Sequence, residues 1–167
     1  MIGLLQRVTS ASVHVDGEQV GAIERGLLVL IAVHRDDQPA DIARLADRIL
    51  GYRVFPDAED RMNRSLLDEQ AGLLLVPQFT LAADTKKGMR ASFTRAAPPE
   101  MGQDYFEQLV GICRERLKIV ETGRFGANMQ VSLVNDGPVT FWLETYGSCA
   151  VTPARYCPHR RVIIGSH

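Results

Sequence analysis

Two short segments of the chain combine residue types that can hold a substrate at the end of a buried strand. The first is Pro77-Gln-Phe-Thr80, within the apolar run Gly72–Leu81, and the second is Asn135-Asp-Gly-Pro-Val-Thr140. Strand ends leave backbone N–H groups unpaired, so these groups can point at a ligand. Each segment also has a plainer interpretation. Asn-Asp-Gly-Pro is typical of a turn, and Gln78 and Thr80 suit the solvent face of a half-buried strand.

The usual residue patterns for nucleophilic or metal chemistry do not occur in the sequence. No histidine belongs to an obvious Ser-His-Asp set, and there is neither a phosphate-binding loop nor a Gly-x-Gly-x-x-Gly motif. Cys149, Cys157 and His159 supply only three metal ligands, at a spacing that matches no familiar site. We therefore expect neither a metal nor a cofactor. Cys113 lies on an apolar helical stripe and is expected to be a core residue.

The elements that would position the two segments are mostly strands. Apolar runs predict strands, and Asp16-Gly17 between two of them predicts a hairpin. Apolar residues at helical spacing predict amphipathic helices over residues 40–51 and 99–117. Strands are predicted over residues 2–9, 11–15, 19–23, 26–33, 52–55, 72–81, 118–121, 129–135 and 139–144. Together these elements indicate an α+β fold, a strand-rich single domain with a barrel-like sheet and two main helices. Because proline cannot donate to a strand ladder, Pro77 should lie at a strand end, an edge or a bulge.

Composition excludes several classes of protein. The 167 residues are 46% hydrophobic and 23% charged, with a formal net charge of −1, which suits a globular domain and not a bulk nucleic-acid binder. The apolar runs are far shorter than the roughly 20 residues of a membrane helix, and neither a signal peptide nor a cysteine framework is recognisable. We therefore expect a cytoplasmic protein with no membrane contact. Any nucleic-acid contact should be local, and its best candidate is the basic segment 84–95, which contains Lys86, Lys87 and Arg90.

Several motifs, taken together, resemble the D-aminoacyl-tRNA deacylase family. They have the order and spacing of that family and extend from Met1 to about Thr145. The resemblance thus covers a deacylase-like domain over residues 1–145, and residues 146–167 form a C-terminal tail of unknown role. The motifs are Gln6-Arg-Val8, Leu50-Gly-Tyr-Arg53, Gln78-Phe-Thr-Leu-Ala-Ala-Asp84, Gly88-Met-Arg90, Thr122-Gly-Arg-Phe125, Met129-Gln-Val-Ser-Leu-Val-Asn-Asp-Gly-Pro-Val-Thr140 and Phe141-Trp-Leu143.

The resemblance implies a homodimer that hydrolyses the ester linking a D-amino acid, or glycine, to the 3′ end of tRNA. Catalytic roles fall on Gln78, Phe79 and Thr80 of one chain, where backbone N–H groups would stabilise the tetrahedral oxyanion. Gly137 and Pro138, joined by a cis bond, would come from the other chain and block the space that an L side chain needs.

The remaining implied contacts concern the substrate. Arg7 is expected to brace the Gly-Pro loop, Met129 to line the pocket and Asn135 to belong to the substrate site. Cations at the basic segment would contact tRNA phosphates near the 3′ end. These cations are Lys86, Lys87 and Arg90.

One residue departs from the family pattern. Where the family usually has serine before the glutamine, this chain has Pro77, and a related branch that deacylates L-alanine mischarged to tRNA carries Pro-Gln there. Two alternatives therefore remain, a deacylase of L-alanyl-tRNA and a tRNA-binding module with lost turnover. The role of Thr80 is also open. As a nucleophile it would need an adjacent base, and as a positioning group it would leave assistance to the ribose 2′-hydroxyl of the substrate.

Overall fold

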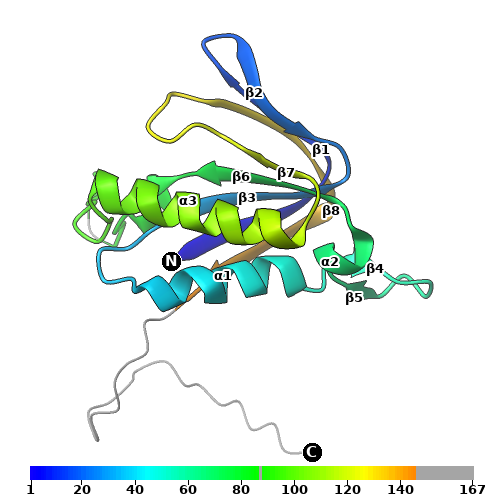
Figure 1. Cartoon of the computed structure of the whole chain (residues 1–167). Helices are drawn as coiled ribbons and strands as arrows, with labels where there is room; N and C mark the ends of the chain where they lie inside the picture. Colours follow the sequence, from blue (N-terminus) through cyan, green and yellow to red (C-terminus); the bar gives the residue numbers. More distant parts are fainter. Residues whose placement is uncertain (87, 146–167) are drawn as a thin grey trace, which may run out of the picture.

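One six-stranded sheet runs through most of the structure, a computed structural model that describes residues 1–86 and 88–145 (Figure 1). Neighbouring strands follow the order β2-β1-β3-β6-β7, and β8 pairs with β1. A second, two-stranded sheet joins β4 and β5. The elements are β1 (Ile2–Val15), β2 (Glu18–Ile23), β3 (Gly26–Ala32), α1 (Pro39–Gly51), β4 (Phe55–Pro56), β5 (Met62–Arg64), α2 (Leu66–Glu69), β6 (Gly72–Pro77), the 3₁₀ helix η1 (Phe79–Ala82), α3 (Pro99–Arg116), β7 (Val120–Thr122) and β8 (Gln130–Glu144).

Strand β1 organises the sheet, which curls into a nearly closed barrel. Its first half pairs with β3, its second half pairs with β2, and β8 pairs with both halves. The predicted hairpin is confirmed, since Asp16 and Gly17 form the turn between β1 and β2 with φ of 50° and 82°. A Cβ on Gly21 of β2 would lie 2.7 Å from the carbonyl oxygen of Thr122 in β7, so glycine permits the close approach of these strands.

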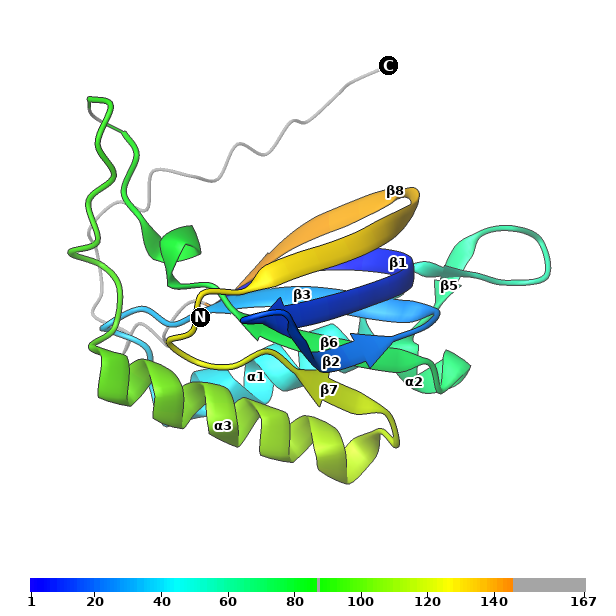
Figure 2. The same cartoon turned by 90° about the horizontal axis from the view of Figure 1, so that it is seen from above.

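The two predicted helices, α1 and α3, cover one face of the sheet (Figure 2). Leu45 and Ile49 of α1 and Leu109 of α3 are fully buried in a core that also contains Leu73 and Leu75 of β6. Burial of one such side chain contributes about 1.5–3 kcal/mol relative to leaving it in water. This packing fixes the direction of β6, and therefore fixes where the segment after Pro77 leaves the sheet.

Several strand predictions need correction. The predicted strands over residues 2–9 and 11–15 form one element, β1, and the strand predicted over residues 52–55 is limited to Phe55–Pro56 of β4. The run predicted as one strand over residues 72–81 ends at Pro77, because Phe79–Ala82 turn into η1. The predicted strands over residues 129–135 and 139–144 form one element, β8, which follows β1 along its length. The register is interrupted on both sides of Val8 of β1, between Gln6 and Val8 and between Val8 and Ser10, and the extra residues 136–139 of β8 are extruded at the first of these breaks. Helix α2 was not predicted.

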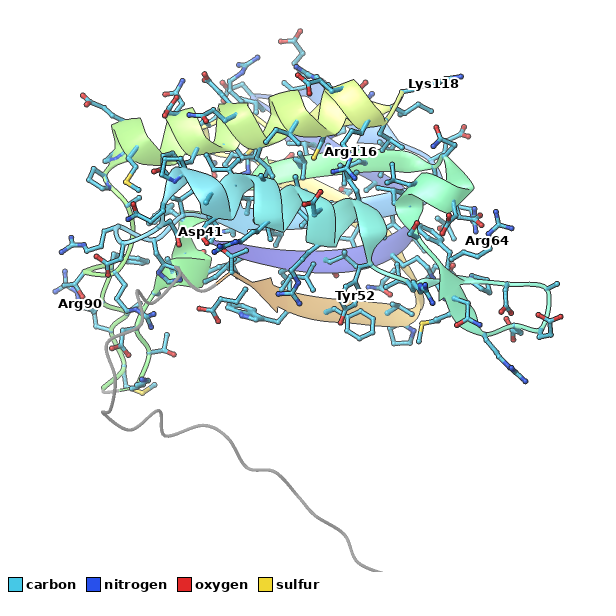
Figure 3. The ribbon with its side chains drawn as sticks, turned by 60° about the horizontal axis from the view of Figure 1, so that its bottom comes forward. Asp41, Tyr52, Arg64, Arg90, Arg116 and Lys118 are labelled. Atoms are coloured by element: carbon cyan, nitrogen blue, oxygen red, sulfur yellow. The ribbon has the colours of Figure 1, made fainter. Side chains whose placement is uncertain are left out.

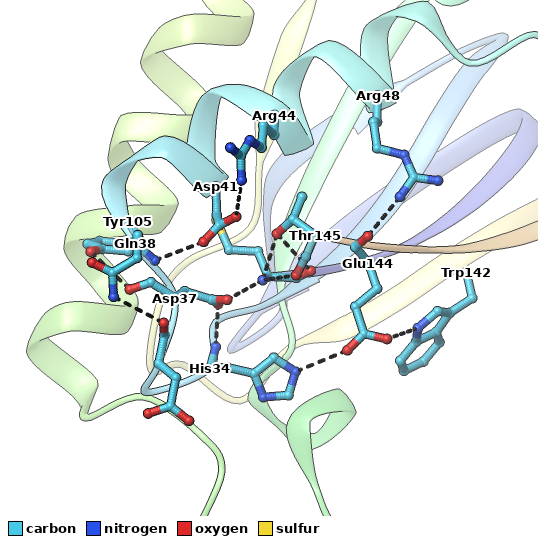
Figure 4. A network of polar contacts seen from close by, with 12 residues as sticks. His34, Asp37, Gln38, Asp41, Arg44, Arg48, Tyr105, Trp142, Glu144 and Thr145 are labelled. Carbon is cyan, nitrogen blue, oxygen red and sulfur yellow. Dashed lines mark hydrogen bonds and ion pairs between the residues drawn. The ribbon is translucent and has the colours of Figure 1, made fainter. Parts of the chain in front are cut away.

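A polar network joins the first residues of β1, the last residues of β8 and the start of α1 (Figure 4). The Met1 ammonium donates to the carboxylate of Asp37 and to Thr145 Oγ1. The other Asp37 oxygen accepts from the backbone N–H of His34 at 2.7 Å. Because Met1 and Asp37 are both buried, these contacts hold the start of β1 and the end of β8 against the segment that leads into α1.

Candidate active site

A cavity of about 470 Å³ opens beside the end of β6. Its walls come from the ends of β3 and β6, from η1, from the first turns of α3 and from the segment between β7 and β8. None of the described residues that line it is acidic, basic, a histidine or a cysteine. The lining residues are Ile31, Ala32, Val33, Val76, Pro77, Gln78, Phe79, Ala97, Pro99, Gly102, Phe106, Phe125, Gly126, Ala127, Asn128, Met129 and Val131.

The segment Gln78–Thr80 forms the polar rim of this cavity. The last ladder bond at this end of β6 runs from the N–H of Gln78 to the carbonyl oxygen of Ile31, at 2.6 Å. After it the chain enters η1, whose first N–H groups lack partners within the helix. No hydrogen bond among the described residues uses the N–H of Phe79 or of Thr80. Both are therefore free to donate to an oxygen of a ligand.

The Thr80 hydroxyl is exposed and has one side-chain partner among the described residues. The donor is the side-chain amide nitrogen of Gln78, Nε2, which donates to Thr80 Oγ1. An amide cannot remove a proton from a hydroxyl, so this contact orients Thr80 and does not activate it as a nucleophile.

The wall opposite η1 is the segment between β7 and β8. The N–H of Gly123 donates to the carbonyl oxygen of Leu75 at 2.9 Å, and Met129 Sδ accepts from the N–H of Arg124 at 3.3 Å. Phe125 faces Gly102 of α3, where a Cβ would lie 3.3 Å from its ring. Met129 therefore lines the cavity as expected. Phe125 was missed as a lining residue, although the Thr122–Phe125 motif had already singled out its segment.

The loop around Gly137 and Pro138 is built from the extruded part of β8. Asn135 closes it, because its Oδ1 accepts from the N–H of Val139 at 2.7 Å and its Nδ2 donates to Thr140 Oγ1 at 3.0 Å. The peptide bond between Gly137 and Pro138 is cis. Both residues are exposed in the single chain.

Arg7 holds this loop from the side of β1. Its Nε lies 3.0 Å from the carbonyl oxygen and 3.1 Å from the carboxylate of Asp136, and its Nη1 donates to the carbonyl oxygen of Val54 at 2.6 Å. The Arg7 side chain is only 12% exposed, so water screens these contacts weakly. The guanidinium thus ties the loop to the residue that precedes β4.

One chain does not bring the two groups of predicted residues together. Gln78, Phe79 and Met129 share the cavity, with Thr80 at its rim, whereas Gly137 and Pro138 are absent from its lining. Figure 2 shows that β8 bends at the far end of the sheet from η1. Arg7 and Asn135 lie at this bend, as their contacts with the loop show.

The predicted cations occupy the long loop between η1 and α3. Lys86 and Arg90 are exposed, and neither forms an ion pair within the described residues. Figure 3 shows Arg90 at the opposite end of the molecule from Arg64 of β5. Lys87 lies outside the described residues, and so does the tail 146–167.

Clusters of metal-ligating side chains and membrane-spanning helices are both absent from residues 1–86 and 88–145, the part of the chain that the structure describes. No three histidine, cysteine, aspartate or glutamate side chains gather there as metal ligands would. No helix there is long and apolar enough to cross a membrane.

Cys113 is buried on α3, and burial raises the pKa of its thiol to about 12, which agrees with its expected place in the core.

The fold and the site define a class of protein, a barrel-like α+β domain with a mostly apolar cavity at the end of a strand. A family model described as D-Tyr-tRNA(Tyr) deacylase matches residues 4–144, and the chain belongs to that family. It is 63% identical over 150 residues to a D-aminoacyl-tRNA deacylase of Alkalilimnicola ehrlichii, covering 90% of this chain and all of that protein.

Two solved structures have a similar fold. A c-Myc DNA unwinding element binding protein superposes with a TM-score of 0.84 at 38% identity, over 88% of this chain and all of the other. A probable eukaryotic D-amino acid tRNA deacylase superposes with a TM-score of 0.74 at 18% identity, over 85% of this chain and 97% of the other. The second likeness concerns the fold alone.

Proposed function

We propose that this protein hydrolyses the ester bond of D-aminoacyl-tRNA, and of glycyl-tRNA, to release free tRNA and the amino acid. Family membership supports the reaction class. The observation that carries the mechanism is a cavity without ionisable lining residues, rimmed by the unpaired N–H groups of Phe79 and Thr80. Such a site suits an ester that is already reactive and needs positioning and oxyanion stabilisation.

Hydrolysis begins when the ester carbonyl oxygen lies against these two N–H groups. As water adds to the carbonyl carbon, negative charge develops on that oxygen, and each N–H donor stabilises it by about 2.7–4 kcal/mol. The bond between the carbonyl carbon and the ribose 3′-oxygen then breaks, and the proton that the attacking water gives up passes through the neighbouring 2′-hydroxyl to the leaving 3′-oxygen. Gln78 orients the Thr80 hydroxyl, which positions the substrate.

This role for Thr80 predicts a modest effect of its removal. Thr80→Ala keeps both backbone donors, so we expect kcat to fall by about 10-fold, the loss of one neutral hydrogen bond. Single-turnover deacylation of D-Tyr-tRNA measures it, with Thr80→Ser as the matched control that keeps the hydroxyl. Complete loss in Thr80→Ala with activity retained in Thr80→Ser would make Thr80 the nucleophile and refute this mechanism.

Selection of the D-enantiomer requires a second copy of the chain. We propose a homodimer in which the Gly137–Pro138 loop of each copy caps the cavity of the other, so that an L side chain meets rigid main chain. A D side chain points away from this loop, and glycine has no side chain to exclude. In the proposed site Met129 contacts the substrate, and Arg7 and Asn135 hold the loop.

Strand β8 supports the pairing of two copies. It pairs only with β1 among the described strands, and before Leu143 none of its residues is buried. Its outward side chains include Val134 at 57% exposure and Trp142 at 50%. A long edge strand with exposed apolar residues is a surface that proteins usually cover. Size-exclusion chromatography with light scattering tests the pairing, and a monomer at micromolar concentration would refute it.

One deacylation experiment separates the proposed function from its alternatives. The purified protein is incubated with D-Tyr-tRNA, L-Tyr-tRNA, Gly-tRNA and L-Ala-tRNA, and release of each amino acid is followed. Release from the D-ester and the glycyl ester supports the proposal. Preference for L-alanine would support an L-alanyl-tRNA deacylase, and binding without release would support a tRNA-binding module in which Pro77 has abolished turnover.

The tRNA itself would approach over the loop between η1 and α3. Lys86, Lys87 and Arg90 are proposed to contact phosphates near the 3′ end. We also propose a cytoplasmic location, because aminoacyl-tRNA is used there in translation. Lys86→Gln together with Arg90→Gln should weaken tRNA binding without changing kcat on a bound substrate.

A further inference from the structure

Two aromatic side chains stand exposed beside the cavity. Phe79 of η1 is 60% exposed and Phe93 of the following loop is 42% exposed. Their ring centroids are 5.1 Å apart with an interplanar angle of 51°, so each ring supports the other and keeps open area toward solvent. Phe79 also lines the cavity, which places the pair at its mouth.

The backbone around Phe93 is anchored on both sides. The N–H groups of Asp84 and Ser92 each donate to the carbonyl oxygen of the other, at 2.7 and 3.0 Å. On the other side, the carbonyl oxygen of Phe93 accepts from Ala96 at 3.0 Å, and the loop then pairs with the residues after β3. Phe93 is therefore held in place before any ligand arrives, which lowers the entropy cost of binding to it.

Charge directs a polyanion toward this pair. Exposed cations lie in the loop between η1 and α3 and in the segment after β3 that pairs with this loop, and none of them forms an ion pair among the described residues. They are Arg35, Lys86, Arg90 and Arg95. The N-terminal half of α3, which forms part of the cavity wall, instead exposes Glu100, Asp104 and Glu107. A nucleic-acid strand entering the cavity is thus attracted over the aromatic pair and repelled from α3.

We propose that Phe93, supported by Phe79, stacks on the nucleobase that precedes the terminal adenosine of the aminoacylated RNA. This inference rests on the proposed function, in which the terminal aminoacyl nucleoside occupies the cavity. A cavity of about 470 Å³ holds one ligand of that size. The preceding nucleotide therefore lies outside it, at the mouth where Phe79 and Phe93 expose their rings. Aromatic rings and cations together are the usual binding surface for single-stranded RNA.

The test compares two substrates with the same scissile ester, D-tyrosyl-tRNA and 3′-O-D-tyrosyl-adenosine, of which only the first has a preceding base. Phe93→Leu keeps an apolar side chain and removes the flat ring. We expect it to lower kcat/KM for the tRNA substrate about 10-fold, through KM, and to leave kcat/KM for the adenosine ester unchanged. Phe93→Tyr, which keeps the ring, and Met89→Ala, which changes another exposed side chain of the loop, should both behave as wild type.

The outcomes distinguish stacking by Phe93 from the other roles that its side chain could have. An equal loss on both substrates would show that Phe93 only supports the loop, and no loss on tRNA would refute stacking. A change of oligomeric state in Phe93→Leu would mean that a second copy covers the ring. If the wild-type protein cleaves neither ester, the proposed function fails. Stacking is then judged by binding of a fluorescently labelled CCA trinucleotide without an amino acid, measured by fluorescence anisotropy. Its affinity must still fall about 10-fold in Phe93→Leu.

Discussion

Replacing Arg7 by lysine tests whether the guanidinium holds the Gly137–Pro138 loop in the position that excludes L-amino acids. Arginine reaches Asp136 with Nε and Val54 with Nη1, on two sides of its planar fork. A lysine ammonium keeps the charge, but it is a single point and cannot hold both partners. The variant therefore loses at least one charge-assisted hydrogen bond in a mostly buried place, which costs about 1.5–3 kcal/mol.

That free energy sets the expected change in selectivity. If it holds the loop against displacement by an L side chain, the preference for D-Tyr-tRNA over L-Tyr-tRNA should fall by about 10- to 100-fold in Arg7→Lys. The assay is kcat/KM on each ester, with thermal unfolding measured in parallel. Arg116→Lys is the matched control, because its pair with Asp47 is exposed and contributes little. Lower stability with unchanged selectivity would refute the reasoning and leave Arg7 as a support of the fold alone.

Other outcomes follow from the same structure. Cys113 should stay unlabelled by iodoacetamide at pH 8 in the native protein and react after unfolding, because a pKa of about 12 keeps its thiol protonated; rapid native labelling, read by peptide mass spectrometry, would contradict this. Leu45→Ala should lower the free energy of unfolding in urea by about 2–5 kcal/mol, and a value below about 1 kcal/mol would mean that the core collapses around the change. Trp142→Arg should shift the protein toward monomer in light scattering and reduce activity with it, whereas an intact dimer would place the interface elsewhere. The logarithm of the tRNA association constant should fall with the logarithm of salt concentration with a slope of about −2, as a few phosphate contacts require, and a slope near −9 would show a much broader interface.

Local chemistry explains what could be predicted from the sequence. The Asp16–Gly17 turn and the helices α1 and α3 depend on residues close in the chain, so the local sequence was sufficient to predict them. Pro77 was expected at a strand end, an edge or a bulge because proline cannot donate to the ladder, and the structure places it at the end of β6, although the strand had been predicted to continue to residue 81.

The remainder depends on contacts between distant parts of the chain. The continuity of β8 comes from its register with β1, which no pattern within residues 130–144 reveals. Phe125 lines the cavity because it packs beside Gly102 of α3, and Phe93 lies at the cavity mouth because its ring contacts Phe79 of η1. The residues next to Phe125 and Phe93 in the chain predicted only a turn and a long loop. The motif Asn135–Thr140 did single out the extruded loop, but one chain alone does not bring it to the cavity.

The bare edge of β8 also affects how the protein must be produced. If the proposed homodimer forms through β8, a newly made chain presents unpaired main-chain groups next to Val134 and Trp142 until it pairs, and such an edge is a template for unwanted strand pairing. Substitutions that weaken self-association should therefore first reduce the yield of soluble protein, before any assay detects a slower turnover. Expression at low temperature and high chaperone levels would recover such variants, because both limit the time that this edge remains uncovered.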